Sequence, residues 1–228
     1  MTQDPGRLRD VLARARQVLL DFDGPVCSVF AGLPVTQIAA ELQALVDHVE
    51  DGPVIDDPHQ VLIHAAVTGA DIAAVEDALR SAEIRAARSA TPTPGAADFL
   101  TACQRTGRPV TIVSNNSADA IAAYFEREDL THLVARIVGR DPADPRLMKP
   151  NPHLIRLALD GNPPHEAVLI GDSTTDITAA HAAGVPAIGY ANKPGKTARL
   201  QAAGADALVT AMHELALTAE QPTGATTS

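Results

Sequence analysis

Cysteine is scarce in this sequence of 228 residues, and its scarcity excludes two kinds of structure. The two cysteines, Cys27 and Cys103, lie far apart and belong to no CxxC or Cys/His pattern. Disulfide-stapled and zinc-stabilised domains need several such residues at short, regular spacings. Because the chain depends on neither, it suits a reducing compartment, and we expect a cytoplasmic protein.

Long hydrophobic runs and long basic runs are also missing. The apolar run at residues 18–20 soon meets Asp21 and Asp23, so it is too short for a signal-peptide core or a membrane span. The chain has 28 acidic and 18 basic side chains, a net charge of −10, and no Lys/Arg run that could follow a phosphate backbone. We therefore expect neither a membrane nor a nucleic acid as partner; the sequence does not indicate an oligomeric state.

Aromatic residues make up only 3% of the chain, yet the composition is that of a globular protein. Hydrophobic residues account for 46% and charged residues for 20%, and the mean hydropathy is +0.02. The length suits one large domain or one domain with an insertion.

The hydrophobic pattern divides the chain into a helical stretch and an alternating stretch. An amphipathic helix at 7–16 leads into a short apolar run at 17–22 that is typical of a buried parallel strand. We find no convincing strand between residues 26 and 91, only helical segments, at 35–49, 59–68 and 71–88.

From residue 96 onward, helical and strand-like segments alternate. Helices are expected at 96–106, 117–127, 152–160, 174–183, 196–203 and 211–219, and strands at 109–114, 133–138, 167–171, 185–190 and 206–209. Such alternation predicts an α/β fold with a doubly wound parallel sheet, whose ligands bind at the carboxyl ends of the strands. We expect a core of residues 1–25 and 92–220, a helical insertion at 26–91 and a flexible tail at 221–228.

Asp21 and Asp23 follow the first expected strand. Residues i and i+2 of a strand share a face, so both carboxylates can point into one small volume. Neighbouring carboxylates repel each other and need a cation or a shared proton. A hard cation such as Mg²⁺ would remove this repulsion, leaving one carboxylate as a nucleophile and the other free for proton transfer.

Two further clusters supply groups that suit phosphate. Residues 114–117 (SNNS) follow a strand, where a hydroxyl group and main-chain N–H groups can cradle phosphate oxygens. Lys149 stands just before a helix, and its ammonium group could neutralise charge on both Asp21 and a phosphoryl group.

A fourth cluster, at residues 171–176 (GDSTTD), adds two more acids. Asp172 lies at a strand end and Asp176 follows one helical turn later, so both can face the same ion, directly or through water. Ser173 or Thr174 also suits a helix N-cap.

These motifs, DFDG, SNN, Lys-Pro and GDSTTD in that order, resemble the four signature motifs of the haloacid dehalogenase superfamily, in particular its phosphoglycolate phosphatase-like members with a small helical cap. The resemblance spans nearly the whole chain. It implies a Rossmann-like core, a cap at residues 26–91 that closes over the site, and an enzyme that releases phosphate from a small phosphorylated metabolite.

The resemblance also implies a role for each site residue. Asp21 would attack phosphorus to give an aspartyl-phosphate, and Asp23 would act as general acid and base. Ser114, the main-chain N–H of Asn115 and Lys149 would hold the phosphoryl group. Mg²⁺ would be held by four residues: Asp21, Asp23 through its main-chain carbonyl, Asp172 and Asp176.

Pro25 departs from the family pattern, which usually has Thr or Val at this position. Proline has no N–H and a restricted φ, so the loop after Asp23 cannot make every usual contact. This departure concerns the hinge to the insertion and the choice of substrate.

Other functions remain open at this stage. A phosphomutase of the β-phosphoglucomutase type would keep the fold and pass the phosphoryl group between hydroxyls. A non-catalytic module that accepts a phosphoryl group on Asp21, or an inactive relative retained for protein binding, would use the same acids differently. A dehalogenase would not require Asp23, and a phosphonate hydrolase would need a lysine that residues 26–91 do not contain.

Several residues of the insertion have two possible roles. Cys27 and Phe30 either touch substrate or pack the hinge. Four basic side chains are candidates for gripping the far end of a substrate, and equally for an ordinary polar surface: His59, His64, Arg85 and Arg88.

Overall fold

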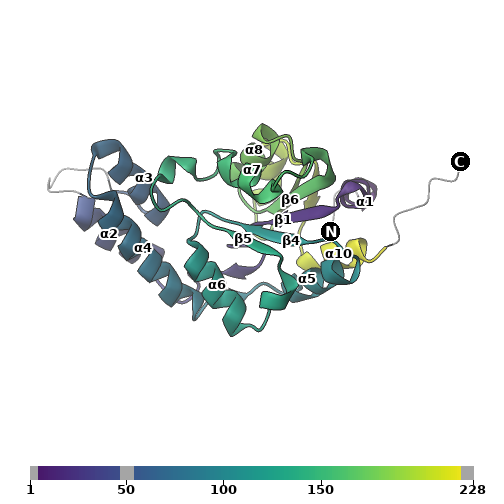
Figure 1. Ribbon diagram of the computed structural model, residues 1–228, viewed down its shortest axis with the longest axis horizontal. Coiled ribbons are helices and arrows are strands. Elements are labelled where there is room, and N and C mark those ends of the chain that lie inside the picture. Colours follow the sequence, from purple (N-terminus) through teal and green to yellow (C-terminus); the bar gives the residue numbers. More distant parts are fainter. Residues whose placement is uncertain (1–4, 47–53, 222–228) are drawn as a thin grey trace, which may run out of the picture.

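The structure is a computed structural model, and it describes residues 5–46 and 54–221. Its centre is a six-stranded parallel sheet in the order β5-β4-β1-β6-β7-β8 (Figure 1). The strands are β1 (Gln17–Leu20), β4 (Val110–Val113), β5 (Arg136–Val138), β6 (Ala167–Gly171), β7 (Ala187–Tyr190) and β8 (Ala207–Val209). This arrangement confirms the predicted doubly wound parallel sheet.

Helices cover both faces of this sheet, and the strand residues alternate between them. On one face lie α1 (Pro5–Arg14), α5 (Ala96–Arg105), α6 (Ala118–Arg127) and α10 (Met212–Ala219). On the other lie α7 (His153–Leu159), α8 (Thr174–Ala182) and α9 (Lys196–Ala202). Val18 and Leu20 pack into the first layer and Leu19 into the second, because successive strand side chains point to opposite faces.

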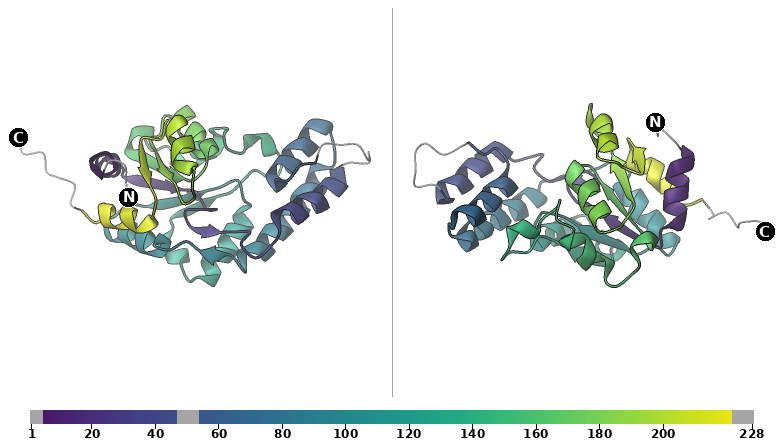
Figure 2. Two further views of the ribbon diagram at one scale, coloured as in Figure 1. Left: turned by 180° about the vertical axis from the view of Figure 1, so that it is seen from behind. Right: turned by 90° about the horizontal axis from the view of Figure 1, so that it is seen from above.

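Three helices form a separate layer at one end of the sheet (Figures 1 and 2). They are α2 (Val35–Val46), α3 (Pro58–Thr68) and α4 (Ile72–Ala87), and they share an apolar cluster of their own that includes Leu42, Leu62 and Leu79. Asp57 and Asp71 cap the N-termini of α3 and α4, and Gly69 ends α3 in the left-handed conformation, so the chain itself marks these boundaries. The expected helix at 35–49 is described as far as Val46; residues 47–49 lie outside the described residues, as does most of the expected tail.

The expectation of no strand between residues 26 and 91 is wrong at both ends of that stretch. Two short strands, β2 (Cys27–Ser28) and β3 (Thr91–Pro92), pair antiparallel where the chain leaves the sheet and returns to it. Strands of two residues carry no readable alternation, which explains why the pattern did not predict them. The expected strand at 133–138 begins instead with a 3-10 turn at Thr131–Leu133; the other 3-10 turns described are Pro145–Leu147 and Pro164–Glu166.

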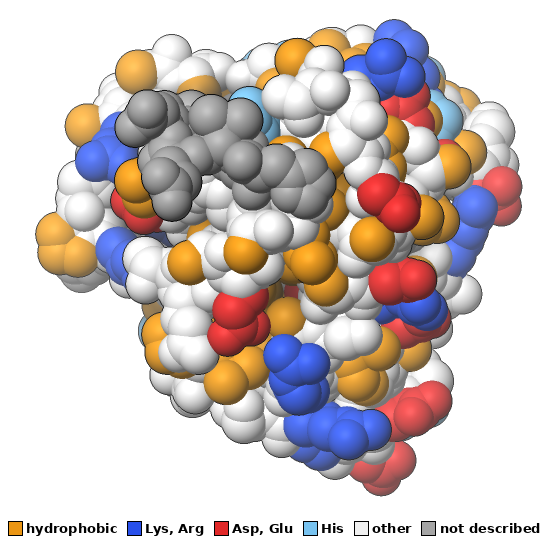
Figure 3. All heavy atoms as spheres, turned by 90° about the vertical axis from the view of Figure 1, so that its left-hand side faces the viewer, with side chains coloured by type: hydrophobic (Ala, Val, Ile, Leu, Met, Phe, Trp, Pro, Cys, Tyr) orange, Lys and Arg blue, Asp and Glu red, His pale blue; other side chains and the backbone are white. Residues whose placement is uncertain are grey.

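The end of the molecule that carries the insertion shows basic, acidic and apolar side chains interspersed (Figure 3). None of the helices in the described residues has the length and apolar character needed to cross a lipid bilayer.

Candidate active site

Asp21 stands directly after β1, in the middle of the sheet. Its main-chain N–H donates to the carbonyl of Ile170 on β6 at 2.9 Å, which continues the pairing of the two strands by one residue. Its buried carboxylate accepts a hydrogen bond from Lys149 Nζ at 2.8 Å. The predicted nucleophile and the predicted lysine are therefore in direct contact.

Lys149 also joins Asp21 to a second acid. Its ammonium group donates to Asp176 Oδ1 at 2.5 Å and to the carbonyl of Val113 at 3.0 Å. Burial alone would lower the pKa of Lys149, but the carboxylates of Asp176 and Asp21 raise it above its ordinary value. This ammonium is thus a fixed positive charge between two buried acids.

Asp176 has a structural role in addition to the predicted metal role. Its Oδ2 accepts hydrogen bonds from the N–H and the hydroxyl of Ser173, which closes a capping box at the start of α8. Ser173, and not Thr174, is therefore the N-cap. Because both Asp176 oxygens already accept hydrogen bonds, we expect this residue to contribute less to holding an ion than Asp21 and Asp172.

Two glycines make room for the acids. A Cβ on Gly171 would lie 2.5 Å from the Cβ and Cγ of Asp176, and a Cβ on Gly24 would collide with the carboxylate of Asp172. Gly24 also has a φ of +113°, a conformation that other residues rarely adopt. Side chains at these two positions would push Asp172 and Asp176 away from Asp21.

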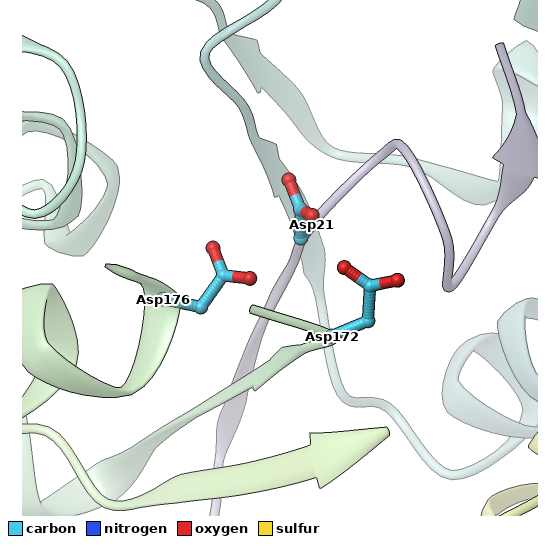
Figure 4. Close-up of side chains that lie close together, drawn as sticks. All are labelled: Asp21, Asp172 and Asp176. Atoms are coloured by element: carbon cyan, nitrogen blue, oxygen red, sulfur yellow. The ribbon is translucent and has the colours of Figure 1, made fainter. Parts of the chain in front are cut away.

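Asp21, Asp172 and Asp176, three of the four residues expected to hold an ion, lie close together (Figure 4). One ligand oxygen from each lies within 4.8 Å of the others. Three carboxylate oxygens are the hard ligands that Mg²⁺ prefers. A further observation fits a cation with bound water at this place: Asn192 Nδ2 donates to Asp172 at 3.2 Å, whereas Asn192 Oδ1 is buried without a hydrogen-bond partner among the described residues.

The electrostatics of this cluster favour protonation of Asp21 as long as no divalent cation is bound. Burial, and then the charge of Asp176, raise the pKa of Asp21 to about 8 against the opposing effect of Lys149. Burial also raises the pKa of Asp172, although its ion pair with Lys196 opposes the shift. Lys149 and Lys196 therefore do not neutralise all the negative charge of these carboxylates, and a divalent cation can supply the missing positive charge.

The loop at residues 114–117 lies beside Lys149 and is tied to it. Asn115 Oδ1 accepts from the main-chain N–H of Lys149 at 2.8 Å, and Asn115 Nδ2 donates to the Lys149 carbonyl at 3.1 Å. Ser114 is buried, and its hydroxyl donates to Asn116 Oδ1 at 3.1 Å. Ser117 is the N-cap of α6. The three predicted phosphate-binding residues thus lie on two loops that are held together.

Asp23 is exposed and stands apart from the three clustered acids. Its Oδ1 accepts from the main-chain N–H of Val29 at 3.0 Å. The loop closes without an N–H from Pro25, because Gly24 N–H donates to Cys27 at 2.7 Å and Val26 N–H to Phe22 at 3.1 Å. Proline at this position therefore does not disrupt the turn that carries Asp23.

A pocket of about 480 Å³ opens beside Asp23 and Asp172. Phe30 lines it, whereas Cys27 is fully buried in the core, and burial raises the pKa of its thiol. The four basic residues singled out in the insertion do not line it: His59, His64, Arg85 and Arg88. Hollows of about 650 and 540 Å³ flank α1, but no candidate site residue lines them.

Comparison with known proteins establishes the family. The model of the haloacid dehalogenase-like hydrolases matches residues 30–190, a range that includes Ser114, Lys149, Asp172 and Asp176 and begins after Asp21 and Asp23. The chain belongs to the haloacid dehalogenase-like hydrolase family. This finding confirms the resemblance noted in the motifs.

Curated relatives of this hydrolase include phosphoglycolate phosphatases. The protein of Escherichia coli strain K12 is 33% identical over 96 residues, which are 42% of this chain and 38% of that protein. The protein of Salmonella typhi is 31% identical over a stretch of the same length. The match thus covers well under half of either relative.

Solved structures show that the fold extends over nearly the whole chain. CbbY from Rhodobacter sphaeroides, in complex with phosphate, superposes with a TM-score of 0.67 at 22% identity and covers 88% of this chain and 96% of its own. L-2-haloacid dehalogenase from Xanthobacter autotrophicus, with chloropropionic acid covalently bound, gives 0.62 at 19% identity, covering 89% and 97%. At such low identity these similarities show the fold alone.

The hydrolase has a buried group of charges that the sequence did not reveal. Arg140 donates to both oxygens of Glu76, at 2.6 and 2.9 Å, and to Glu83 Oε1 at 2.5 Å, and the side chains of Arg140 and Glu83 are fully buried. Glu76 and Glu83 are two turns apart on one face of α4. The spacing of these two acids was the one sequence feature that could have revealed the buried charges. Acids on one helix face, however, usually mark a solvated surface.

This group of charges connects the insertion to the phosphate loop. Glu83 accepts from the N–H of Ser117 at 2.9 Å and from Asn116 Nδ2 at 3.2 Å, while Arg140 donates to the carbonyl of Asn115 at 3.1 Å. His59 contacts Glu83 at 3.2 Å. Burial alone would raise the pKa of Glu83, but His59 and Arg140 lower it to about 2, so the carboxylate stays ionised.

Binding of Mg²⁺ should release a proton below about pH 8. In the metal-free chain the raised pKa of Asp21 keeps its carboxylate largely protonated at pH 6.5, and the ion requires the ionised form. At pH 9 Asp21 is already ionised, so the release should disappear. Calorimetric titration in buffers of different ionisation enthalpy measures this proton directly. Equal release at both pH values, or release that persists in Asp21→Asn, would contradict the assignment.

Replacing Arg140 should destabilise the fold strongly. Arg140→Met leaves Glu76 and Glu83 buried without their cation, and we expect the free energy of unfolding to fall by about 3 to 5 kcal/mol. Denaturant unfolding followed by circular dichroism measures the change. Arg80→Met is the matched control, because Arg80, on the helix that carries Glu76 and Glu83, pairs with Asp77 and Asp119 at the surface and should matter far less. If the free energy of unfolding fell equally in the two variants, the buried ion pair would stabilise the fold no more than the surface pair does.

Proposed function

We propose that this hydrolase is a Mg²⁺-dependent phosphatase that hydrolyses a small phosphorylated metabolite through an aspartyl-phosphate on Asp21. The observation that carries the proposal is the position of Lys149, whose ammonium contacts Asp21 and Asp176 beside a third carboxylate and the Ser114 loop. Such a site gathers positive charge, hydrogen-bond donors and a nucleophile within one small volume, as transfer of a phosphoryl group requires.

In the first half of the reaction, a carboxylate oxygen of Asp21 attacks phosphorus and the bond from phosphorus to the ester oxygen breaks. Asp23 gives its proton to the leaving oxygen; its exposed position at the pocket suits a group that must reach the leaving alcohol. In the second half Asp23 takes a proton from water, whose oxygen attacks phosphorus. The bond to Asp21 then breaks, and inorganic phosphate is released.

The phosphoryl group would be held by Ser114, the N–H of Asn115 and Lys149. The hydrogen bonds between Asn115 and Lys149 keep these two loops in register, so the donors are placed before substrate arrives. A bound Mg²⁺, held by Asp21, Asp172 and Asp176 with the main-chain carbonyl of Asp23, would neutralise the negative charge that gathers on the phosphoryl oxygens.

The helical insertion is proposed to act as the cap of this site. Its first residues line the pocket beside Asp23, and its last helix is bonded through Glu83 to the phosphate loop. A layer in this position can exclude water from the aspartyl-phosphate. The cytoplasmic location and the absence of membrane and nucleic-acid partners stay predictions.

Replacing Asp21 tests the proposal. With Mg²⁺ and p-nitrophenyl phosphate, we expect the wild-type chain to release phosphate and Asp21→Asn to lose at least about a thousand-fold in kcat, because an amide cannot act as the nucleophile. The rate of phosphate release measures both, and Asp98→Asn, an exposed acid on α5, is the control that should keep full activity.

Three results would contradict the proposal. They are an unchanged rate in Asp21→Asn, a rate that survives removal of divalent cations, and the appearance of an isomeric phosphate ester from a hexose 1-phosphate without net release. The last would favour the phosphomutase alternative.

A further inference from the structure

Lysine is rare in this chain, and its placement is distinctive. Lys149, Lys193 and Lys196 are its only lysines; every other member of the Lys/Arg set is arginine. Lys149 contacts Asp21, and Lys193 and Lys196 line the pocket that opens beside Asp23 and Asp172. All the lysines of the chain therefore surround one site, although they come from two separate segments of the chain.

The two pocket lysines have different surroundings. Lys196, the first residue of α9, forms an ion pair with Asp172 Oδ2. Lys193 is exposed, and its ammonium group forms no hydrogen bond or ion pair with any residue in the part of the chain that the structure describes. Lys193 therefore presents an unneutralised positive charge to the pocket.

Asn192 is a third polar residue of this pocket, and its side-chain oxygen is free to accept a hydrogen bond. It lines the same pocket, donates to Asp172 and leaves its buried Oδ1 without a partner among the described residues. Buried acceptors in folded proteins are nearly always satisfied, so this oxygen points to a donor that belongs to a bound species. Two cations and an unsatisfied acceptor on one wall form a polar surface built for a ligand.

The part of the pocket lining that comes from the insertion carries no charge. The insertion contributes Ser28, Phe30, Ala31 and Val35, but none of the basic side chains that the structure describes in it lines the pocket. Among the described residues that line this pocket, Lys193 and Lys196 alone can therefore supply the countercharge for an anionic group. The volume of about 480 Å³ restricts the occupant to a small molecule.

We propose that Lys193 and Lys196 form a second anion-binding subsite, which selects phosphate esters that carry another anionic group, a carboxylate or a second phosphate, at the end remote from the reacting phosphoryl group. The proposal rests on the proposed function, because it names the class of substrate for that site. Asn192 Oδ1 accepts a hydrogen bond from a hydroxyl group or bound water next to that anion.

Lys196 couples this subsite to the carboxylate cluster. In the metal-free chain its ammonium neutralises Asp172, a carboxylate that also belongs to the candidate ion site. Two cations on one carboxylate repel each other, so Lys196 loses this partner when the cluster holds a divalent ion. Its flexible stem lets the ammonium turn to the substrate anion. The subsite is therefore complete only in the loaded protein.

Matched substrates test the selectivity. 2-Phosphoglycolate and ethyl phosphate differ by a carboxylate in place of a methyl group, and ethane-1,2-diyl bisphosphate supplies the second-phosphate arm. We expect the wild type to prefer, in kcat/KM, one or both of the esters that carry a second anionic group, and Lys193→Met and Lys196→Met each to lose about ten-fold or more of that preference. Ethyl phosphate should be hydrolysed at a similar rate by the wild type and Lys193→Met. Arg199→Met, an exposed cation on α9, is the control and should keep the preference.

A binding measurement separates this inference from the proposed function. Lysine labelled with ¹³C at Cε gives signals that single Lys→Met variants assign. With Mg²⁺ present, phosphonoacetate or ethane-1,2-bisphosphonate should shift the Lys193 and Lys196 signals, and ethylphosphonate should not; the larger of the two shifts identifies carboxylate or phosphate as the preferred anion. In calorimetry, Lys196→Met should bind Mg²⁺ severalfold more tightly than the wild type, because the competing cation is gone.

Each outcome bears on one of the two proposals. Unshifted Lys193 and Lys196 signals, or a substrate preference that survives both lysine variants, would overturn the subsite. Shifted signals in a chain that releases phosphate from no ester would support the subsite and contradict the phosphatase assignment.

Discussion

A buried ammonium group makes the rest of the site possible. Asp21, Asp172 and Asp176 bring ligand oxygens within 4.8 Å of one another, and their mutual repulsion would be severe in a site with so little water. Lys149 reduces it by donating to two of them and to the Val113 carbonyl. The central strands, the capping box of α8 and the loop before α7 all converge on this one contact.

The same site is held from outside by a second group of buried charges. Arg140 and Glu83 bond the loop that contains Asn115 and Ser117 to α4, so the insertion is attached to the phosphate loop by hydrogen bonds. Charges buried in this way destabilise a fold when one partner is lost. Their hydrogen bonds fix the position of the loop relative to the insertion.

Local pattern was sufficient for most of the fold and for the order of the chemical groups. Apolar runs such as residues 17–20 predict buried parallel strands, and the helix–strand alternation after residue 96 predicts a doubly wound sheet, because periodicity and capping are properties of neighbouring residues. Asp21, Lys149 and Asp172 could be singled out for the same reason: each lies next to a helix or strand whose end can be recognised from the sequence pattern. The two-residue strands at 27–28 and 91–92 could not, since they exist only because distant segments meet.

By itself, then, the sequence determined the fold class, the helical insertion and the candidate acids, because these depend on spacing along the chain. Only the tertiary structure decided that Arg140 neutralises Glu76 and Glu83, and that lysines from the core, not histidines or arginines of the insertion, line the pocket. These facts depend on which side chains share a buried volume. Packing of segments far apart in the chain sets that volume, and no local pattern encodes it.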